Sequence, residues 1–312
     1  MKRIIVTGAT GQIGSELVFE LRKKYGKNEV VAVGHSKKEP VDQDSGPFES
    51  VDVTDKNALD ELVKKYQPDT IFHLVGILSA TGEKNPELAW NVNMNGLKNI
   101  LDISIARGVK QIFWPSSIAA FGPSTPRENT PQHTILEPTT MYGVTKVAGE
   151  LLCQYYHKKF GLDIRSLRYP GLISYKTPPG GGTTDYAVAI YFEALKNNSY
   201  ECFVSPETVL PMMYMPDGVR ATIELMETPA ENIKVRTSYN LTAMSFSAKE
   251  LAESVAKSVS GFKCTYNPDD RQRIADSWPK SIDDSAARAD WGWKHEFDLD
   301  KMTKDMLKNI KV

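Results

Sequence analysis

The chain has 312 residues, of which 41% are hydrophobic and 25% are charged, so it can bury a substantial core in one large or two smaller domains. Its net charge of -1 gives no reason to expect nucleic acid or an anionic membrane as a partner. The sequence shows neither a run of about 18 apolar residues nor a leader-like apolar segment, so we expect a cytoplasmic protein with no membrane contact.

The first predicted elements are a strand, a turn and a helix. An apolar, β-branched run over residues 4–7 gives way to glycines at Gly8, Gly11 and Gly14, and a helical pattern then extends to Tyr25. Glycine permits the tight turn and lets the backbone approach a pyrophosphate, whose charge the helix N-terminus offsets. The spacing is GxxGxxG rather than the commoner GxGxxG, so a plain tight turn is the alternative. The position directly after a strand favours a dinucleotide site.

Strand and helix patterns alternate through the first 170 residues or so. Strands are predicted at residues 30–33, 48–53, 70–75, 111–115 and 163–169, and helices at 57–66, 86–107 and 141–160. This alternation predicts an α/β fold with a Rossmann-type, doubly wound parallel sheet. A ligand should then bind at the carboxyl ends of the strands.

The pattern changes after Gly171. A loop rich in proline and glycine covers residues 178–182, a helix follows at 186–195, and one more strand and helix are predicted at 239–241 and 247–260. We therefore expect residues 1–172, with a returning strand and helix near 236–260, to form an NAD(P)-binding domain. Residues 173–235 and 261–312 should form a smaller C-terminal substrate-binding domain.

Tyr142 and Lys146 lie four residues apart in the helix predicted at 141–160, so their side chains share one helix face. A phenol, with a reference pKa of about 10, is a poor base at neutral pH unless a nearby cation favours its ionised form. Lys146 would supply that cation. An ordinary surface pair is the alternative, and the glycine turn upstream favours the catalytic interpretation.

Several motifs resemble the extended short-chain dehydrogenases/reductases, the family that includes NAD-dependent epimerases and dehydratases. They are the glycine turn at residues 8–14, Asp52-Val53, residues 73–76, residues 91–93, Ser116-Ser117 and the Tyr142/Lys146 pair. Longer strings at residues 76–80, 93–96, 166–171, 182–187 and 210–215 are most similar to the L-threonine 3-dehydrogenases of this fold. The resemblance implies oxidation of L-threonine to 2-amino-3-oxobutyrate, with hydride transfer to NAD.

The resemblance also implies the catalytic set. Oxidation of a secondary alcohol removes the hydroxyl proton while hydride leaves the same carbon. We expect Tyr142 to be the general base, Lys146 to lower its pKa and hold the nicotinamide ribose, and Ser117 to hydrogen-bond the substrate oxygen. Ser116 is expected to be a substrate or structural contact.

Cofactor contacts are expected along the strand ends. The expected residues are Gly8, Gly11, Gln12, Ile13, Gly14, His35, Ser36, Asp52, Val53, Leu74, Val75, Gly76, Asn93, Tyr142, Lys146, Tyr169, Pro170 and Leu172. One position departs from the family pattern, because Gly34 stands where NAD-selective members carry an acid that binds the adenosine ribose. The resemblance implies NAD, while His35, Ser36 and Lys37 leave NADP open.

Substrate contacts are expected from groups that suit an α-amino acid. The candidates are Ser79, Ser116, Ser117, Tyr142, Gly182, Thr183, Thr184 and Trp278. Their hydroxyl and backbone N–H groups suit a carboxylate and an ammonium. Thr183 and Thr184 could equally cap the helix at 186–195, and a buried Trp278 could belong to the core.

Other functions and assemblies remain open. A nucleotide-sugar epimerase or dehydratase of the same fold would use the same Tyr and Lys, and a non-catalytic dinucleotide-sensing protein would need neither. Apolar residues spread widely around the helices at 86–107 and 141–160 predict a homodimer that pairs these helices. The three cysteines and five histidines show no ligand spacing, so no disulfide framework and no metal site are expected.

Overall fold

A seven-stranded parallel sheet organises the first part of the chain in the computed structural model, which describes residues 1–35, 46–180 and 182–311. The strand order is β10 (Tyr239–Asn240), β6 (Asp163–Tyr169), β5 (Gln111–Ser117), β4 (Thr70–His73), β1 (Ile4–Thr7), β2 (Val30–Gly34) and β3 (Phe48–Ser50). The chain order reverses on either side of β1, which is where open α/β sheets bind ligands. The predicted fold class is confirmed.

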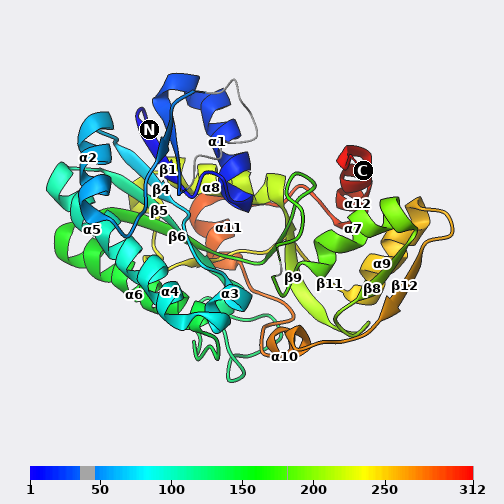
Figure 1. Cartoon of the computed structure of the whole chain (residues 1–312). Coiled ribbons are helices and arrows are strands. Elements are labelled where there is room, and N and C mark those ends of the chain that lie inside the picture. Colours follow the sequence, from blue (N-terminus) through cyan, green and yellow to red (C-terminus); the bar gives the residue numbers. More distant parts are fainter. Residues whose placement is uncertain (36–45, 181, 312) are drawn as a thin grey trace. The chain divides into compact units, whose positions relative to one another are not determined.

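Helices cover both faces of this sheet (Figure 1). On one face lie α2 (Lys56–Tyr66), α5 (Gly96–Arg107) and α6 (Met141–Phe160), and on the other lie α1 (Gln12–Tyr25) and α8 (Met215–Glu227). Alternate strand residues such as Ile71 and Trp114 point toward α2, α5 and α6 and share one buried apolar cluster with them. This cluster is the core beneath the predicted catalytic helix.

The bounds predicted for α6 agree with the structure. Thr140 caps its N-terminus, because its hydroxyl oxygen accepts a hydrogen bond of 3.1 Å from the Gly143 N–H. Gly161, with a φ of 71°, ends the helix in the left-handed region that favours glycine. Local signals at both ends therefore determine where Tyr142 and Lys146 lie.

The helix predicted at residues 86–107 is present with the predicted bounds, but a π-helical turn interrupts it. The structure has α4 (Pro86–Trp90), the π-helical turn (Asn91–Asn95) and then α5. The extra residue in a π turn changes the direction of the side chains that follow, and such turns are frequent at functional sites. Here the turn contains Asn93, whose side chain bonds to a neighbouring loop.

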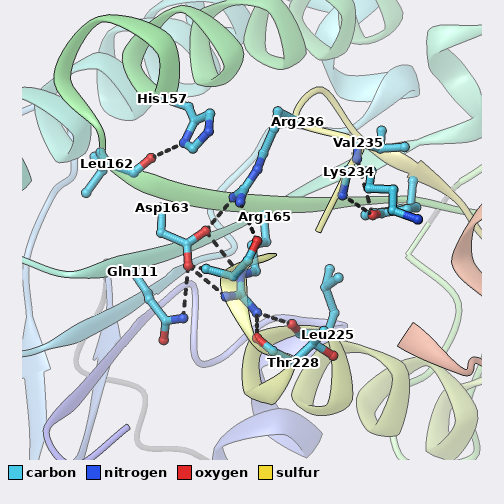
Figure 2. A network of polar contacts seen from close by, with 12 residues as sticks. Gln111, His157, Leu162, Asp163, Arg165, Leu225, Thr228, Lys234, Val235 and Arg236 are labelled. Carbon is cyan, nitrogen blue, oxygen red and sulfur yellow. Dashed lines mark hydrogen bonds and ion pairs between the residues drawn. The ribbon is translucent and has the colours of Figure 1, made fainter. Parts of the chain in front are cut away.

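A polar network attaches residues 219–239 to the sheet (Figure 2). The buried Arg165 on β6 donates hydrogen bonds of 2.5 and 2.6 Å to the carbonyls of Leu225 and Thr228 at the end of α8. Asp163 forms ion pairs with Arg165 and, at 2.6 Å, with Arg236. Unpaired carbonyls at a helix C-terminus attract cations, so the network both completes α8 and fixes it to β6.

The chain forms two compact units whose bounds differ from the predicted domains. The first comprises Met1–Ser117, Thr140–Arg168 and Val219–Tyr239, and the second comprises Ile118–Thr139, Tyr169–Gly218 and Asn240–Val312. The returning strand is present as β10, and the helix that returns with it is α8 rather than a helix within 236–260. The Arg165 network is the physical reason, because it joins the C-terminal half of α8 to β6.

The second unit contains elements that the sequence patterns missed. A mixed sheet has the order β11 (Met244–Ser247), β9 (Val209–Tyr214) and β7 (Gly171–Ile173), and β12 (Lys263–Tyr266) pairs in parallel with β8 (Ser199–Cys202). Two of its helices, α7 (Tyr186–Asn197) and α9 (Ala248–Ser258), were predicted, whereas α10 (Arg271–Asp276), α11 (Ser285–Trp291) and α12 (Leu299–Asn309) were not.

The remaining short elements are α3 (Ser79–Lys84) and three 3-10 turns at Lys27–Glu29, Ile118–Ala120 and Ala230–Asn232. None of the helices in the described ranges has the length and apolar character needed to span a bilayer. The described residues also contain no group of three or more histidine, cysteine or acidic side chains suited to a metal ion.

Candidate active site

The glycine turn after β1 has the shape of a pyrophosphate cradle. Gly8 has a φ of 74°, and a Cβ there would lie 2.9 Å from the Val75 nitrogen. A Cβ on Gly14 would overlap the Gly8 carbonyl oxygen. Gly11 precedes α1 without a side-chain cap, so the helix presents backbone N–H groups and the positive end of its dipole. A larger residue at Gly8 or Gly14 would clash with the backbone of the chain itself, so the tight turn requires glycine there.

Other predicted cofactor residues of the first unit follow the strand ends. Leu74, Val75 and Gly76 come directly after β4, beside Gly8. Val53 is buried against Gly96, where a Cβ would lie 2.9 Å from Val53 Cγ2. The Asp52 carboxylate accepts 2.8 Å hydrogen bonds from the Thr54 N–H and hydroxyl, and the N–H bond is the main cause of its lowered pKa.

The end of β2 carries the departure from the family pattern. A Cβ on Gly34 would lie 3.0 Å from Phe48 Cζ and 3.3 Å from Thr10 Cγ2, so this position is tightly packed. His35 is exposed, and its Nε2 lies 3.5 Å from Asp52 Oδ2. Ser36 and Lys37 lie outside the described residues. No acidic side chain occupies Gly34's place to repel a 2′-phosphate.

Asn93 joins three parts of the first unit. Its Oδ1 accepts a 2.7 Å hydrogen bond from the Ile77 N–H, and its Nδ2 donates to the Ile77 carbonyl at 3.1 Å. The same Nδ2 donates to Thr145 Oγ1 at 3.0 Å, and that hydroxyl donates to the Tyr142 carbonyl at 2.8 Å. Asn93 therefore positions α6 relative to the loop after β4, and its contact with a cofactor stays a prediction.

Ser117 and Tyr142 meet at the carboxyl end of β5. Ser117 is the last residue of that strand, and Tyr142 is in the first turn of α6. Burial raises the pKa of the Tyr142 phenol to about 12, and a hydrogen bond with Ser117 opposes that rise. Because the two oxygens share this bond, one substrate oxygen could contact both of them.

Lys146 lies beneath Tyr142 and is almost fully buried, with 5% of its surface exposed. Its Nζ donates a 2.5 Å hydrogen bond to the Pro115 carbonyl and lies 5.3 Å from the centre of the Tyr142 ring. Burial lowers the pKa of the amine to about 7. The amine is directed at the Pro115 carbonyl, and the expected lowering of the Tyr142 pKa by Lys146 stays a prediction.

Ser116 points away from Ser117 and into the core. Its hydroxyl donates a 2.6 Å hydrogen bond to Glu150 Oε1, and Arg168 binds both oxygens of the same buried carboxylate at 2.8 and 2.6 Å. Two roles are expected for Ser116, a substrate contact or a structural contact, and this geometry favours the structural one. The sequence reasoning missed Glu150 and Arg168. The sequence does contain one signal for this pair, because Glu150 lies four residues after Lys146 and therefore on the same face of the predicted helix.

His73 ends β4 near this group and is fully buried. Its Nδ1 lies 2.7 Å from the Thr7 hydroxyl, and its Nε2 has no partner within the described part of the chain. Burial, with a further contribution from Lys146, lowers its pKa to about 3, so the imidazole is neutral.

The predicted substrate residues are divided between the units. Ser79 begins α3 in the first unit and is buried, whereas Gly182, Thr183, Thr184 and Trp278 are in the second. Tyr169, Pro170 and Leu172, expected to contact the cofactor, are also in the second unit. Trp278 is buried, as expected for a core tryptophan.

The loop before α7 is braced by Asp185. Its carboxylate accepts hydrogen bonds from the N–H groups of Gly180 and Gly182, at 2.6 and 2.8 Å. The N-cap residue of α7 is Asp185, and its side chain makes no cap hydrogen bond. Among the described residues, no cap hydrogen bond from Thr183 or Thr184 is found either, and their contact with the substrate stays a prediction.

Comparison with known proteins agrees with this geometry. The profile of the NAD dependent epimerase/dehydratase family matches residues 4–241. A Staphylococcus saprophyticus protein named as an uncharacterized epimerase/dehydratase is 53% identical, over 99% of this chain and 97% of the relative.

Two solved structures are also similar over the whole chain. The GalE-like L-threonine dehydrogenase of Cupriavidus necator, in its holo form, is 50% identical with a TM-score of 0.97, covering 99% of this chain and 100% of that one. A monomeric L-threonine 3-dehydrogenase from a metagenome database, in its apo form, is 50% identical with a TM-score of 0.94 and covers 98% of both chains.

Proposed function

This chain belongs to the NAD dependent epimerase/dehydratase family, and we propose that within it the protein oxidises L-threonine to 2-amino-3-oxobutyrate with NAD as the hydride acceptor. The observation that carries the proposal is the meeting of Ser117, Tyr142 and Lys146 at the end of β5. About 50% identity to L-threonine dehydrogenases over nearly the full chain supports the choice of substrate. A non-catalytic dinucleotide sensor has no need of these three residues together.

The glycine turn is proposed to hold the dinucleotide pyrophosphate at the N-terminus of α1. A bound nicotinamide supplies the acceptor for the hydride. The residues of the chain supply the rest of the site. Gly34 leaves the adenosine ribose without an acidic partner, so we propose NAD as the cofactor with weak discrimination against NADP.

Proton transfer is assigned to Tyr142. Its phenolate oxygen takes the proton of the substrate hydroxyl, while the Ser117 hydroxyl donates a hydrogen bond to the same substrate oxygen. Lys146 is proposed to hold the nicotinamide ribose and to keep positive charge beneath the Tyr142 ring, 5.3 Å from its centre.

Recognition of the amino acid is assigned to Ser79, Thr183, Thr184 and the backbone of Gly182. Hydroxyl and N–H donors suit the carboxylate, and hydroxyl or carbonyl oxygens suit the ammonium. Asp185 supports the proposal because it holds the Gly180 and Gly182 backbone through its own carboxylate. Trp278 is proposed as a further substrate contact.

The test is a steady-state assay of the purified chain. L-Threonine, L-serine, L-allo-threonine, UDP-glucose and UDP-galactose are each supplied with NAD or with NADP, and reduced cofactor is followed by its absorbance. We expect reduction with L-threonine above all others. Turnover of a UDP-hexose without net cofactor reduction would instead assign the chain to the sugar epimerases of its family.

A homodimer is proposed through α4 and α6. Val144, Leu151 and Tyr155 are exposed along one stripe of α6, and Leu88 and Trp90 are exposed on α4. Leu151 has 57% of its surface exposed. An apolar stripe on a charged chain favours burial against a second copy. One similar enzyme is described as monomeric, so the assembly state of this chain requires its own measurement.

A further inference from the structure

Trp114 lies directly below the Lys146 amine in the buried face of β5. The Lys146 Nζ is 4.5 Å from the centre of the indole ring, closer than it is to the centre of the Tyr142 ring. Trp114 is buried within the cluster formed by α2, α5, α6 and the sheet. A cation this close to a desolvated indole face is attracted by the quadrupole of the ring.

Helix α6 leaves room for the indole ring because the residue that faces the ring is a glycine. Gly149 stands where α6 crosses Trp114, and a Cβ at that position would lie 2.5 Å from Trp114 Cζ2. A side chain there would push the ring away from α6 or tilt it. Gly149 is three residues after Lys146, so the glycine and the amine lie on the same side of the helix. The close approach of strand and helix therefore sets the position of the ring.

The other charged groups around Lys146 do not neutralise its ammonium. On α6, the Glu150 carboxylate raises the pKa of Lys146 from a distance but forms no ion pair with it, because Arg168 from β6 and Ser116 from β5 bind that carboxylate. Cys153 on α6 is buried, which raises its pKa and keeps it a thiol. From β4, the buried His73 is neutral. Tyr142 is a protonated phenol at neutral pH.

Within the described residues, the direct contacts of the Lys146 amine are with the carbonyl of Pro115 and with the faces of the aromatic rings. No carboxylate forms an ion pair with it there. Burial of an amine favours its neutral form. A group that stabilises the ammonium must offset this effect if the charge is to act on Tyr142.

We infer that Trp114 is a positioning residue for the reaction, whose indole face holds the Lys146 ammonium in its charged form under Tyr142. The inference rests on the proposed function, because Lys146 acts there on the general base and on the cofactor ribose. Trp114 is buried in the core cluster, so we assign it no contact with substrate or cofactor. Its effect passes entirely through the ionisation and placement of Lys146.

Three variants and one control separate this role from packing. Trp114→Leu removes the ring face, Trp114→Phe keeps a smaller ring, and Gly149→Ala displaces the indole without removing it. Phe113→Leu is the matched control. Phe113 is a buried aromatic residue on the same strand that packs against Phe72, with ring centres 5.9 Å apart, on the other face of the sheet. Thermal melts compare the loss of stability in all four.

The first readout is NADH affinity as a function of pH, measured by fluorescence without any substrate. Affinity should fall as Lys146 loses its proton. Trp114→Leu and Gly149→Ala should move the midpoint of that fall to lower pH, by about 0.5 to 1.5 pH units for loss of a desolvated cation–π contact. Trp114→Phe should move it by less, and Phe113→Leu should leave it in place.

The second readout is kcat/KM for L-threonine as a function of pH. When Lys146 is neutral over more of the range, Tyr142 ionises less readily, so the rising limb should move to higher pH in Trp114→Leu and Gly149→Ala. Midpoints within about 0.2 pH units of the unmodified protein in both variants would overturn the inference. So would an equal shift in Phe113→Leu.

The two proposals fail separately. If the unmodified protein does not oxidise L-threonine but the NADH midpoint still shifts in the variants, the proposed function is wrong and the role of Trp114 stands. If the protein oxidises L-threonine but no midpoint moves, the role of Trp114 is wrong. Should Trp114→Leu not fold, Gly149→Ala and Trp114→Phe carry the same comparison.

Discussion

Ser116 donates a 2.6 Å hydrogen bond to Glu150 in the core, on the opposite side of β5 from its neighbour Ser117. Successive side chains of a strand point to opposite faces, so only one of two adjacent serines can face Tyr142. The hydrogen bond between Ser117 and Tyr142 identifies which one does. The two serines therefore have separable roles.

Replacing them one at a time should show this difference. Ser117→Ala removes a donor to the substrate oxygen and should lower kcat about a hundredfold or more. Ser116→Ala leaves Glu150 paired with Arg168, so it should cost only ~1 kcal/mol of stability and change kcat little. Steady-state kinetics and thermal melts of both variants measure these effects. Equal losses of kcat would contradict the assignment.

Tyr142→Phe should abolish most of the alcohol oxidation. The general base contributes at least about a hundredfold to the rate, and phenylalanine keeps the ring while removing the oxygen. NADH affinity should change little, because Lys146 keeps its own contacts to Pro115 and Trp114. A fall of less than about tenfold in kcat would make Tyr142 a bystander.

The pH dependence of oxidation follows from the Tyr142 pKa, which burial raises to about 12. The group is a neutral phenol at pH 7. As long as the pH is below the pKa, the ionised fraction of the phenol increases about tenfold each time the pH rises by one unit. The value of kcat/KM for L-threonine should therefore increase with pH between about 7 and 10. The residual rate of Tyr142→Phe should lack this increase, and a flat profile in the unmodified protein would exclude Tyr142 as the base.

Gly34 tests the choice between NAD and NADP. Gly34→Asp adds a charge that repels a 2′-phosphate, but its Cβ also crowds Phe48 and Thr10, at 3.0 and 3.3 Å. Gly34→Ala adds the same Cβ without the charge and is the matched control. Relative to alanine, aspartate should raise the ratio of kcat/KM for NAD over NADP about tenfold, equivalent to ~1.4 kcal/mol.

An unmodified protein that already prefers NAD by more than about a thousandfold would show that another residue governs the cofactor choice. Comparable ratios in the alanine and aspartate variants would lead to the same conclusion. Loss of binding for both cofactors in both variants would show that crowding, not charge, dominates at this position.

The exposed stripe on α6 predicts the assembly state. Leu151→Arg combined with Tyr155→Glu should convert the proposed dimer to a monomer, because charged side chains disfavour an apolar interface. Light scattering at micromolar concentration measures the molar mass of the unmodified protein and of the variant. Ile135→Arg, at an exposed apolar residue of the second unit, is the control and should leave the dimer intact. An unmodified chain that is monomeric and fully active would refute the proposal.

Local sequence signals predicted the first half of the fold well. The β1 strand with its glycine turn and the full extent of α6 follow from β-branched runs, glycines and caps that act within a few residues. The π turn at Asn91–Asn95 was not predictable in this way, because it depends on Asn93 bonding to Ile77 and Thr145. Its apolar pattern resembles one continuous helix.

The candidate site was also predicted only where its residues follow a local sequence pattern. Tyr142, Lys146 and the glycine turn have fixed spacings, whereas the Glu150–Arg168 pair joins a helix to a strand and leaves no periodic mark. The short strands of the second unit pair over long distances in sequence, as β9 does with β7 and β11. These strands are buried because they pair with each other, and the alternation of apolar and polar residues within each strand does not account for their burial.

The attachment of residues 219–239 to β6 also constrains how the protein is made. A ribosome releases the chain from its N-terminus, yet the first unit stays incomplete until Tyr239 has emerged, about 70 residues after Arg168. At about 5 to 20 residues per second, that interval is on the order of 4 to 14 s. During it, β6 lacks its outer neighbour β10, and the buried guanidinium of Arg165 lacks the two carbonyls that it binds in the finished protein. The nascent sheet therefore has an open edge that must be kept from other chains until translation supplies its last strand.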